Sequence, residues 1–263
     1  MDFTRKQYRS LILALQASGI PFTLRHDVDK RPYHSLAIAQ IEAELGVHAV
    51  YYFRCVPCSN NPHVIQAIVN LGHEIGYHYE DMSIAHGNPN KAIQHFQHWL
   101  QYFRQFYPVH RICMHGAPTS QYDGRDLWKT YNYHDYGIDY EPYFDEDFNT
   151  TLYLTDTGRR WDGYKVSVRD KVPQQEQWNQ QGLSFHSTTD IISWLNSHHS
   201  TLPECPEAPH HSPLTTHHSP FTSILITTHP QRWTDKPFEW LLEYTQQSIK
   251  NILKRILICL RKS

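Results

Sequence analysis

Four short motifs bring acidic residues and histidines together, and each lies where a segment with the composition of a β-strand ends. They are RHDVD at 25–29, GHEIGYHYE at 72–80, HGAP at 115–118 and TTHPQRW at 227–233. Carboxylate and imidazole groups in this mixture suit a borderline divalent ion such as zinc, with one coordination position left for water. A further carboxylate beside that position equips a site for metal-assisted hydrolysis. The motifs therefore predict a metal-dependent hydrolytic centre.

The elements that must position these motifs alternate along the chain. Apolar, β-rich runs are expected to form strands at 22–25, 49–53, 74–77, 111–114 and 223–228. Amphipathic segments are expected to form helices at 4–18, 32–45, 63–71, 89–107, 188–198 and 238–260, with loops and short strands over 131–157. This alternation indicates the α/β class, with a parallel sheet or barrel covered by helices. The carboxyl ends of parallel strands share one edge, so the four motifs can meet there.

Three of the motifs resemble those of a known family. The segment GHEIGYH at 72–78 closely resembles the metal-histidine motif of polysaccharide deacetylases. The motif at 25–29 looks like a variant of their leading Asp-Asp motif, and His229 after an apolar strand resembles their late catalytic histidine. The motif order also matches, over roughly residues 20 to 235. The resemblance implies a distorted (β/α) barrel that removes an acetyl group from a sugar with a divalent metal, most simply zinc.

The resemblance also implies roles for individual residues. Asp27 would be the general base, Asp29 and His78 would bind the metal, and His229 would protonate the leaving group. The two acidic residues are adjacent in the family, whereas Val28 separates them here. Alternation along an extended chain still places both carboxylates on one side. The base and ligand roles could therefore be exchanged between Asp27 and Asp29.

The third metal ligand does not follow from the resemblance. The family's second metal histidine falls four residues after the first, and Met82 occupies that position. The candidates for a replacement are Glu80, Asp81, His115 and His229. We favour His115, because its expected strand end faces the same centre. Alternatives are a catalytically inactive carbohydrate-binding or regulatory barrel, and a hydrolase of a non-sugar C–N bond.

Residues around the centre are candidates for contacts with a saccharide. An aromatic side chain and a cation near a site suit stacking on a sugar ring and bonding to it or to its phosphate. The expected substrate-binding residues are Glu80, Asp156, Arg160, Arg232 and Trp233. The stretch 155–162, which contains Asp156 and Arg160, falls where the family places an orienting aspartate and an aromatic residue.

Composition narrows the class of protein. The 263 residues carry 24 basic and 26 acidic side chains, which does not favour a nucleic-acid binder that neutralises phosphates. The five cysteines are scattered, the first residues lack the apolar run of a secretory signal, and no stretch approaches the roughly 18 apolar residues of a spanning helix. We therefore expect a cytoplasmic protein, and the acetylated saccharide that the resemblance implies would then be a glycan precursor or a nucleotide- or lipid-linked saccharide.

The chain is expected to form a single deacetylase-like domain over residues 1–263. Residues 198–220 contain six histidines and five prolines, a composition that predicts an exposed, low-complexity insertion. A C-terminal helix is expected over 237–260, where basic and apolar residues alternate near its end. This helix would dock on the barrel with its basic face in solvent, or contact a membrane surface.

Overall fold

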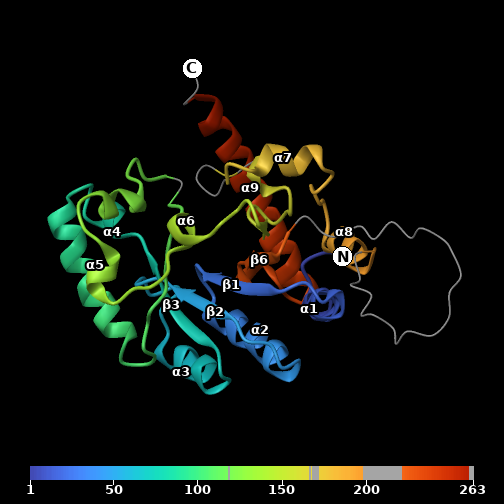
Figure 1. Cartoon of the computed structure of the whole chain (residues 1–263), viewed down its shortest axis with the longest axis horizontal. Coiled ribbons are helices and arrows are strands. Elements are labelled where there is room, and N and C mark those ends of the chain that lie inside the picture. Colours follow the sequence, from blue (N-terminus) through green and yellow to red (C-terminus); the bar gives the residue numbers. More distant parts are fainter. Residues whose placement is uncertain (118, 166, 168–171, 198–220, 261–263) are drawn as a thin grey trace, which may run out of the picture.

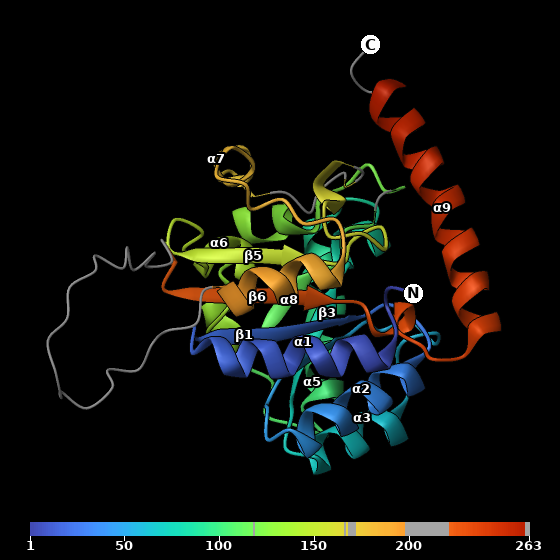
Figure 2. The same cartoon turned by 90° about the vertical axis from the view of Figure 1, so that its right-hand side faces the viewer.

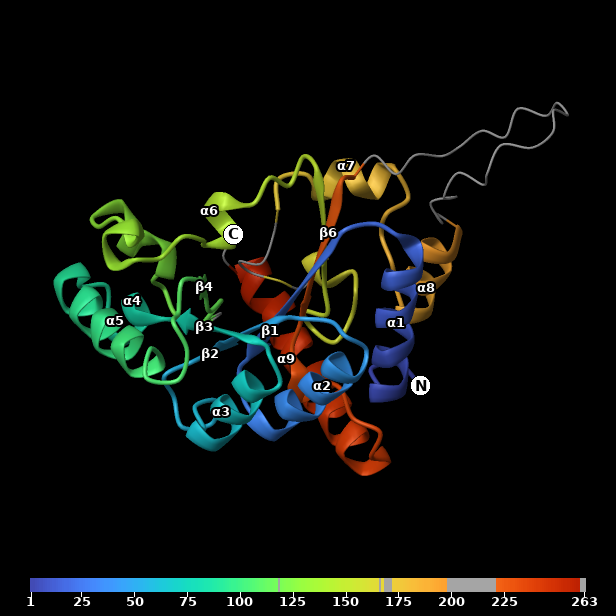
Figure 3. The ribbon, with the colours of Figure 1, turned by 60° about the horizontal axis from the view of Figure 1, so that its bottom comes forward.

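The structure is a computed structural model that describes residues 1–117, 119–165, 167, 172–197 and 221–260, with side chains described as far as 254 (Figure 1). Six strands form one sheet in the order β4-β3-β2-β1-β6-β5, and all neighbouring pairs are parallel. The strands are β1 (Phe22–Val28), β2 (Val50–Phe53), β3 (Glu74–Tyr79), β4 (Ile112–Met114), β5 (Thr151–Thr155) and β6 (Ser223–Thr228). The sheet curls into an incomplete barrel (Figure 3). The predicted α/β class and barrel-like parallel sheet are confirmed.

Helices surround the curled sheet (Figures 1 and 2). They are α1 (Arg5–Ser18), α2 (Pro32–Glu44), α3 (Pro62–Asn70), α4 (Asp81–Ile84), α5 (Pro89–Phe103), α6 (Pro142–Asp145), α7 (Gln175–Gln180), α8 (Thr188–Ser197) and α9 (Pro237–Leu260). Their starts follow from the sequence. Asn61 and Asn88 each accept a hydrogen bond from the backbone N–H three residues later, and proline follows each of them at the first helical position.

The strands that carry the motifs run further than the sequence predicts. β1 continues from the expected end at Arg25 to Val28, and β3 continues from Tyr77 to Tyr79. The polar side chains of these extensions are buried but satisfied by partners, as where Arg25 binds Asp27 through two hydrogen bonds. Asp27 and His78 therefore project from regular strands, which hold them more rigidly than loops would.

A glycine in the second motif has a packing role. A Cβ atom built on Gly76 of β3 would lie 2.4 Å from the ring of Tyr52 on β2. Only a glycine lets that ring lie flat against the neighbouring strand. Tyr52 in turn packs with Val50, Cys113 and Tyr143 under the carboxyl edge of the sheet. The glycine of the motif thus shapes the floor next to His78.

The last helix lies along one side of the body, as Figure 2 shows. α9 coincides with the C-terminal helix expected over 237–260. Several of its apolar side chains are exposed, including Phe238 (78%) and Ile252 (59%). No helix in the described part of the chain is both long and apolar enough to cross a membrane. The insertion expected over 198–220 lies outside the described residues.

Candidate active site

Residues from four separate strands meet at the carboxyl edge of the sheet. A cavity of about 100 Å³ opens there, and its lining includes Asp27, Asp29, His78, His115 and His229. Asp27 belongs to β1 and Asp29 follows it, His78 belongs to β3, and the other two histidines directly follow β4 and β6. Parallel pairing carries these five side chains to one point although 200 residues separate the first from the last. The predicted convergence of the motifs is therefore observed.

Three of these side chains present donor atoms to a common centre. His115 Nδ1 lies 3.2 Å from Asp29 Oδ1 and 3.2 Å from His78 Nε2, and His78 Nε2 lies 3.7 Å from Asp29 Oδ1. The donor atoms all lie within 4.8 Å of one another. Asp29 Oδ1 is buried and has no hydrogen-bond partner among the described residues. One oxygen and two imidazole nitrogens, with an unsatisfied carboxylate oxygen among them, fit a divalent ion such as zinc.

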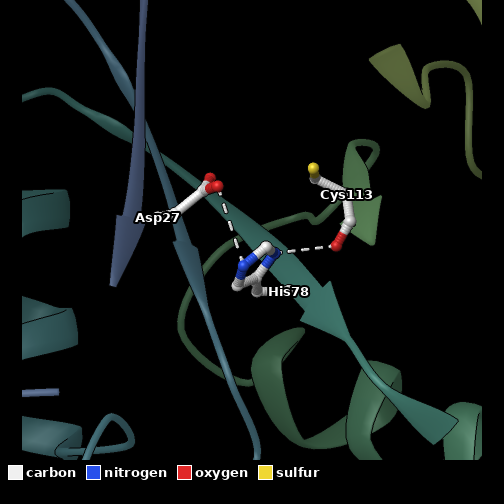
Figure 4. Close-up of side chains that lie close together, drawn as sticks. All are labelled: Asp27, His78 and Cys113. Carbon is white, nitrogen blue, oxygen red and sulfur yellow. Dashed lines mark hydrogen bonds and ion pairs between the residues drawn. The ribbon is translucent and has the colours of Figure 1, made fainter. Parts of the chain in front are cut away.

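His78 is held in the form that binds a metal. Its Nδ1–H donates to the backbone oxygen of Cys113 at 2.9 Å, which leaves the lone pair of Nε2 on the side of the Asp27 carboxylate, 3.7 Å away (Figure 4). Burial lowers the pKa of His78 to about 3, against the opposing effect of the Asp27 carboxylate. The ring is therefore neutral near pH 7.

A second donor group shares His78 but is less suited to an ion. Asp27, His78 and Cys113 also lie within ligand distance of one another (Figure 4). The Asp27 carboxylate, however, accepts two hydrogen bonds from Arg25, at 2.9 and 2.7 Å. Cys113 is completely buried and does not line the cavity. The geometry favours Asp29 as the metal ligand and leaves Asp27 beside it.

Arg25 keeps Asp27 ionised. Both side chains are buried, and burial alone would raise the pKa of Asp27. The charge and hydrogen bonds of the Arg25 guanidinium outweigh that effect and lower this pKa to about 2. Sequence reasoning did not assign Arg25 a role. Its position could have suggested this role, because side chains two residues apart in a strand lie on the same face and Arg25 lies two residues before Asp27.

His229 faces the same centre from β6. Its Nδ1 lies 2.6 Å from Asp156 Oδ1, and its Nε2 lies 3.8 Å from Asp29 Oδ2. Asp156 also accepts hydrogen bonds from the backbone N–H of His229, from Arg232 Nη1 at 2.6 Å and from Trp233 Nε1 at 2.8 Å. Burial opposes ionisation of Asp156, but Arg232 and His229 lower its pKa. This buried carboxylate orients His229 with Nε2 toward the cavity.

Asp156→Ala is expected to destabilise the protein by about 3–5 kcal/mol, the usual cost of removing one partner from a buried ionic network. The alanine leaves the Trp233 Nε1–H buried without its acceptor, and it leaves Arg232 Nη1 with the backbone oxygen of residue 156 but without a carboxylate. Urea unfolding measures the effect, with Asp156→Asn as the control that keeps the size and some hydrogen bonds. A loss below about 1 kcal/mol would show that the network is not needed for stability.

Most of the residues expected to bind substrate do not line the cavity. Trp233 is completely buried against Phe3 and Tyr8, so the expected stacking of its ring on a sugar is corrected. Asp156 is equally buried and contacts His229 rather than the cavity. Of this expected set, Arg232 lines the cavity. Composition near a site does not reveal which way a side chain faces, which explains these differences.

Glu80 and Arg160 are each held by an ion pair outside the cavity lining. Arg54 donates two hydrogen bonds of 2.8 Å to Glu80. Arg160 binds the Asp162 carboxylate, to which Lys165 also donates. The structure brings neither Glu80 nor Arg160 to the cavity of about 100 Å³. Tyr143 and Gln231 are nearby instead: Tyr143 lines this cavity, and Gln231 Nε2 donates to Asp29 Oδ2 at 3.4 Å.

Arg160→Ala is therefore expected to leave hydrolysis unchanged and to affect stability in a pH-dependent way. Burial raises the pKa of Asp162, but the hydrogen bonds from Arg160 and Lys165 lower it to about 2. A depressed folded-state pKa contributes stability above pH ~4 that is lost as the pH falls toward 2. The variant should lose up to about 1 kcal/mol at pH 7 and less at pH 3, measured by urea unfolding. An increased KM would instead place Arg160 at the substrate.

Comparisons with known proteins give little beyond shape. No protein-family model matches the sequence, and no curated protein matches it. A solved structure of a CE4 esterase from Streptococcus mutans is similar, with a TM-score of 0.43 and 12% sequence identity. The similarity covers 97% of this chain and 88% of that chain. A similarity of this degree identifies neither a family nor an activity, so the positions of the side chains are the basis for a function.

Proposed function

We propose that this protein is a metal-dependent hydrolase that removes an acetyl group from a saccharide. The observation that carries the proposal is the convergence of Asp29, His78 and His115, with Asp27 and His229 beside them at one opening. The donor set of one carboxylate and two imidazoles suits zinc. The resemblance of the motifs at 25–29, 72–78 and 229 to those of polysaccharide deacetylases supports the acetylated sugar as substrate.

The chain's own residues provide acid and base groups around the metal ligands. A divalent ion held by Asp29, His78 and His115 would act as a Lewis acid on the acetyl carbonyl. Asp27, kept ionised by Arg25, accepts a proton from the attacking water. His229 Nε2, fixed by the contact of Nδ1 with Asp156, protonates the leaving nitrogen or oxygen. The acetyl group thereby leaves as acetate, and the saccharide regains an amine or hydroxyl group.

His229→Ala tests the proposal through its leaving group. An amide nitrogen cannot depart without a proton, whereas an aryl oxide can. The variant should therefore lose about 10²-fold or more in kcat on an acetamido sugar and much less on 4-nitrophenyl acetate. Kinetics are measured on both substrates with zinc supplied, and His63→Ala, an exposed histidine on α3, is the matched control.

Two results would count against this assignment. Equal losses on the amide and the aryl ester would indicate that His229 binds the metal or supports the fold. No hydrolysis of either substrate by the wild-type protein, with zinc, cobalt or nickel supplied, would favour a non-catalytic carbohydrate-binding barrel.

A further inference from the structure

A second, larger cavity adjoins the candidate active site. It has a volume of about 450 Å³ and is lined by residues after β1 and β6 and by one face of α9. α9 contributes Glu243, Gln247, Lys250 and Lys254, whose spacing places them on one side of the helix. We call this cavity the α9 groove. It shares Asp29, His115 and Arg232 with the smaller cavity, so a ligand held at the candidate metal centre can extend into it.

Positive charge gathers in the α9 groove. Its lining includes Lys30, Arg54, Arg232, Lys250 and Lys254 against the two carboxylates of Asp29 and Glu243. Arg54 is paired with Glu80, and Arg232 with Asp156. Lys30 forms an ion pair with the buried Glu243, because the distance between Lys30 Nζ and Glu243 Oε2 is 3.1 Å. The nearby carboxylates are thus largely taken by the arginines and by Lys30.

Lys250 is a cation of the α9 groove for which no carboxylate partner remains among the described residues. Within the described part of the chain it forms neither a hydrogen bond nor an ion pair of 4 Å or less. Partial burial lowers the pKa of this largely exposed side chain, and the charge of Lys30 lowers it further despite an opposing effect of Glu243. Ammonium groups held near one another repel, and an anion bound between them would relieve that repulsion.

Two buried polar atoms beside these cations also lack partners. Gln231 Oε1 and Arg232 Nε have no hydrogen-bond partner among the described residues, although their side chains are only 2% and 6% exposed. Both residues line the α9 groove. A buried polar group without a partner is costly, and a polar ligand offering donors and acceptors would satisfy both.

We propose that the α9 groove binds an anionic group, a phosphate or carboxylate, carried by the acetylated saccharide. That the bound saccharide is a substrate rests on the proposed function, whereas the binding of its anionic group does not. The volume of about 450 Å³ falls within the range of small-molecule sites and far exceeds the cavity at the metal centre. Lysine is a common phosphate ligand because its ammonium is a compact point charge. The site therefore selects charged over neutral acetylated sugars.

Calorimetric titration of the full chain tests the preference directly. The probes are N-acetylglucosamine, its 1-phosphate and 6-phosphate, N-acetylmuramic acid as a carboxylate, and inorganic phosphate. A chelator is present, because phosphate also binds metal ions. At least one charged sugar should bind about tenfold or more tightly than the neutral sugar, and the advantage should shrink at high salt.

Variants of Lys250 identify the groove as the source of the preference. Lys250→Glu should reduce the preference about tenfold, and Lys250→Arg should keep most of it. Lys250 is exposed on α9, so neither change disturbs the core. Lys91→Ala, at an exposed lysine on α5, is the matched control and should have no effect.

The outcomes separate this inference from the proposed function. Equal affinity for charged and neutral sugars, or a preference that Lys250→Glu leaves unchanged, would overturn the inference. Inorganic phosphate binding as tightly as the sugar phosphates would assign the groove to free phosphate and overturn the claim about substrate. A charged sugar that binds through Lys250 without being hydrolysed, with zinc supplied, would support the inference and contradict the proposed function.

Discussion

Replacing His78 by alanine is expected to lower the affinity for a divalent ion by at least about 100-fold and to remove hydrolysis with it. Loss of a residue that merely orients a ligand commonly costs about 10–100-fold, and His78 supplies a donor atom itself. Its Nε2 faces Asp29 and His115, and its Nδ1–H is fixed by the Cys113 carbonyl. Met82, at the position of the family's second metal histidine, is buried in α4 and is a poor zinc ligand, so it does not replace the lost nitrogen.

Zinc titration of the full chain measures this effect. The histidines of residues 198–220 add the same background binding to every variant, so the difference between variants is the informative quantity. His115→Ala should behave like His78→Ala, and the exposed His63→Ala should match the wild type. If His78→Ala bound zinc with the same affinity and stoichiometry as the wild type and His63→Ala, the three residues would not form a metal site.

Asp27→Asn should lower kcat by about 10²–10⁴-fold while the protein keeps its metal. General-base assistance is usually worth this much, and asparagine cannot accept the proton. The change preserves the size of the side chain beside Arg25 but removes the charge that the guanidinium pairs with. Steady-state kinetics and zinc titration of the same preparation together separate a lost base from a lost ligand.

Asp29→Asn provides the matched comparison, because the two acidic residues could exchange roles by sequence alone. The structure leaves Asp29 Oδ1 without a described hydrogen-bond partner, whereas Asp27 is held by Arg25. Asp29→Asn should therefore weaken metal binding as well as activity. A fully active Asp27→Asn enzyme would move the base elsewhere.

The sequence was sufficient to predict which side chains meet at the carboxyl edge of the sheet, because the topology largely determines that convergence. Alternating strands and helices require parallel strands, and parallel strands bring their carboxyl ends to one edge. That rule alone places His115 near His78, although 37 residues separate them and no motif links them. Asp27 ends up there because it lies near the carboxyl end of β1, and Asp29 because it directly follows that strand.

Contacts that depend on the direction of a side chain could not be predicted in this way. Trp233 and Asp156 lie near the centre, as expected, but they support His229 from within the core. Arg160 turns toward Asp162, two residues along in a loop. The α9 groove is lined by the turn after β1 and by a helix more than 200 residues later in the chain. No local sequence pattern predicts that these two segments lie together. Each of these depends on tertiary packing rather than on spacing.

The central claim is that Asp29, His78 and His115 together hold one divalent ion. Crystals of the full chain grown with zinc, with diffraction data collected on both sides of the zinc absorption edge, test it most directly. The account predicts an anomalous peak about 2.0–2.2 Å from His78 Nε2, from a nitrogen of His115 and from an oxygen of Asp29. Zinc bound elsewhere on the chain, with no anomalous peak among these three residues, would contradict it.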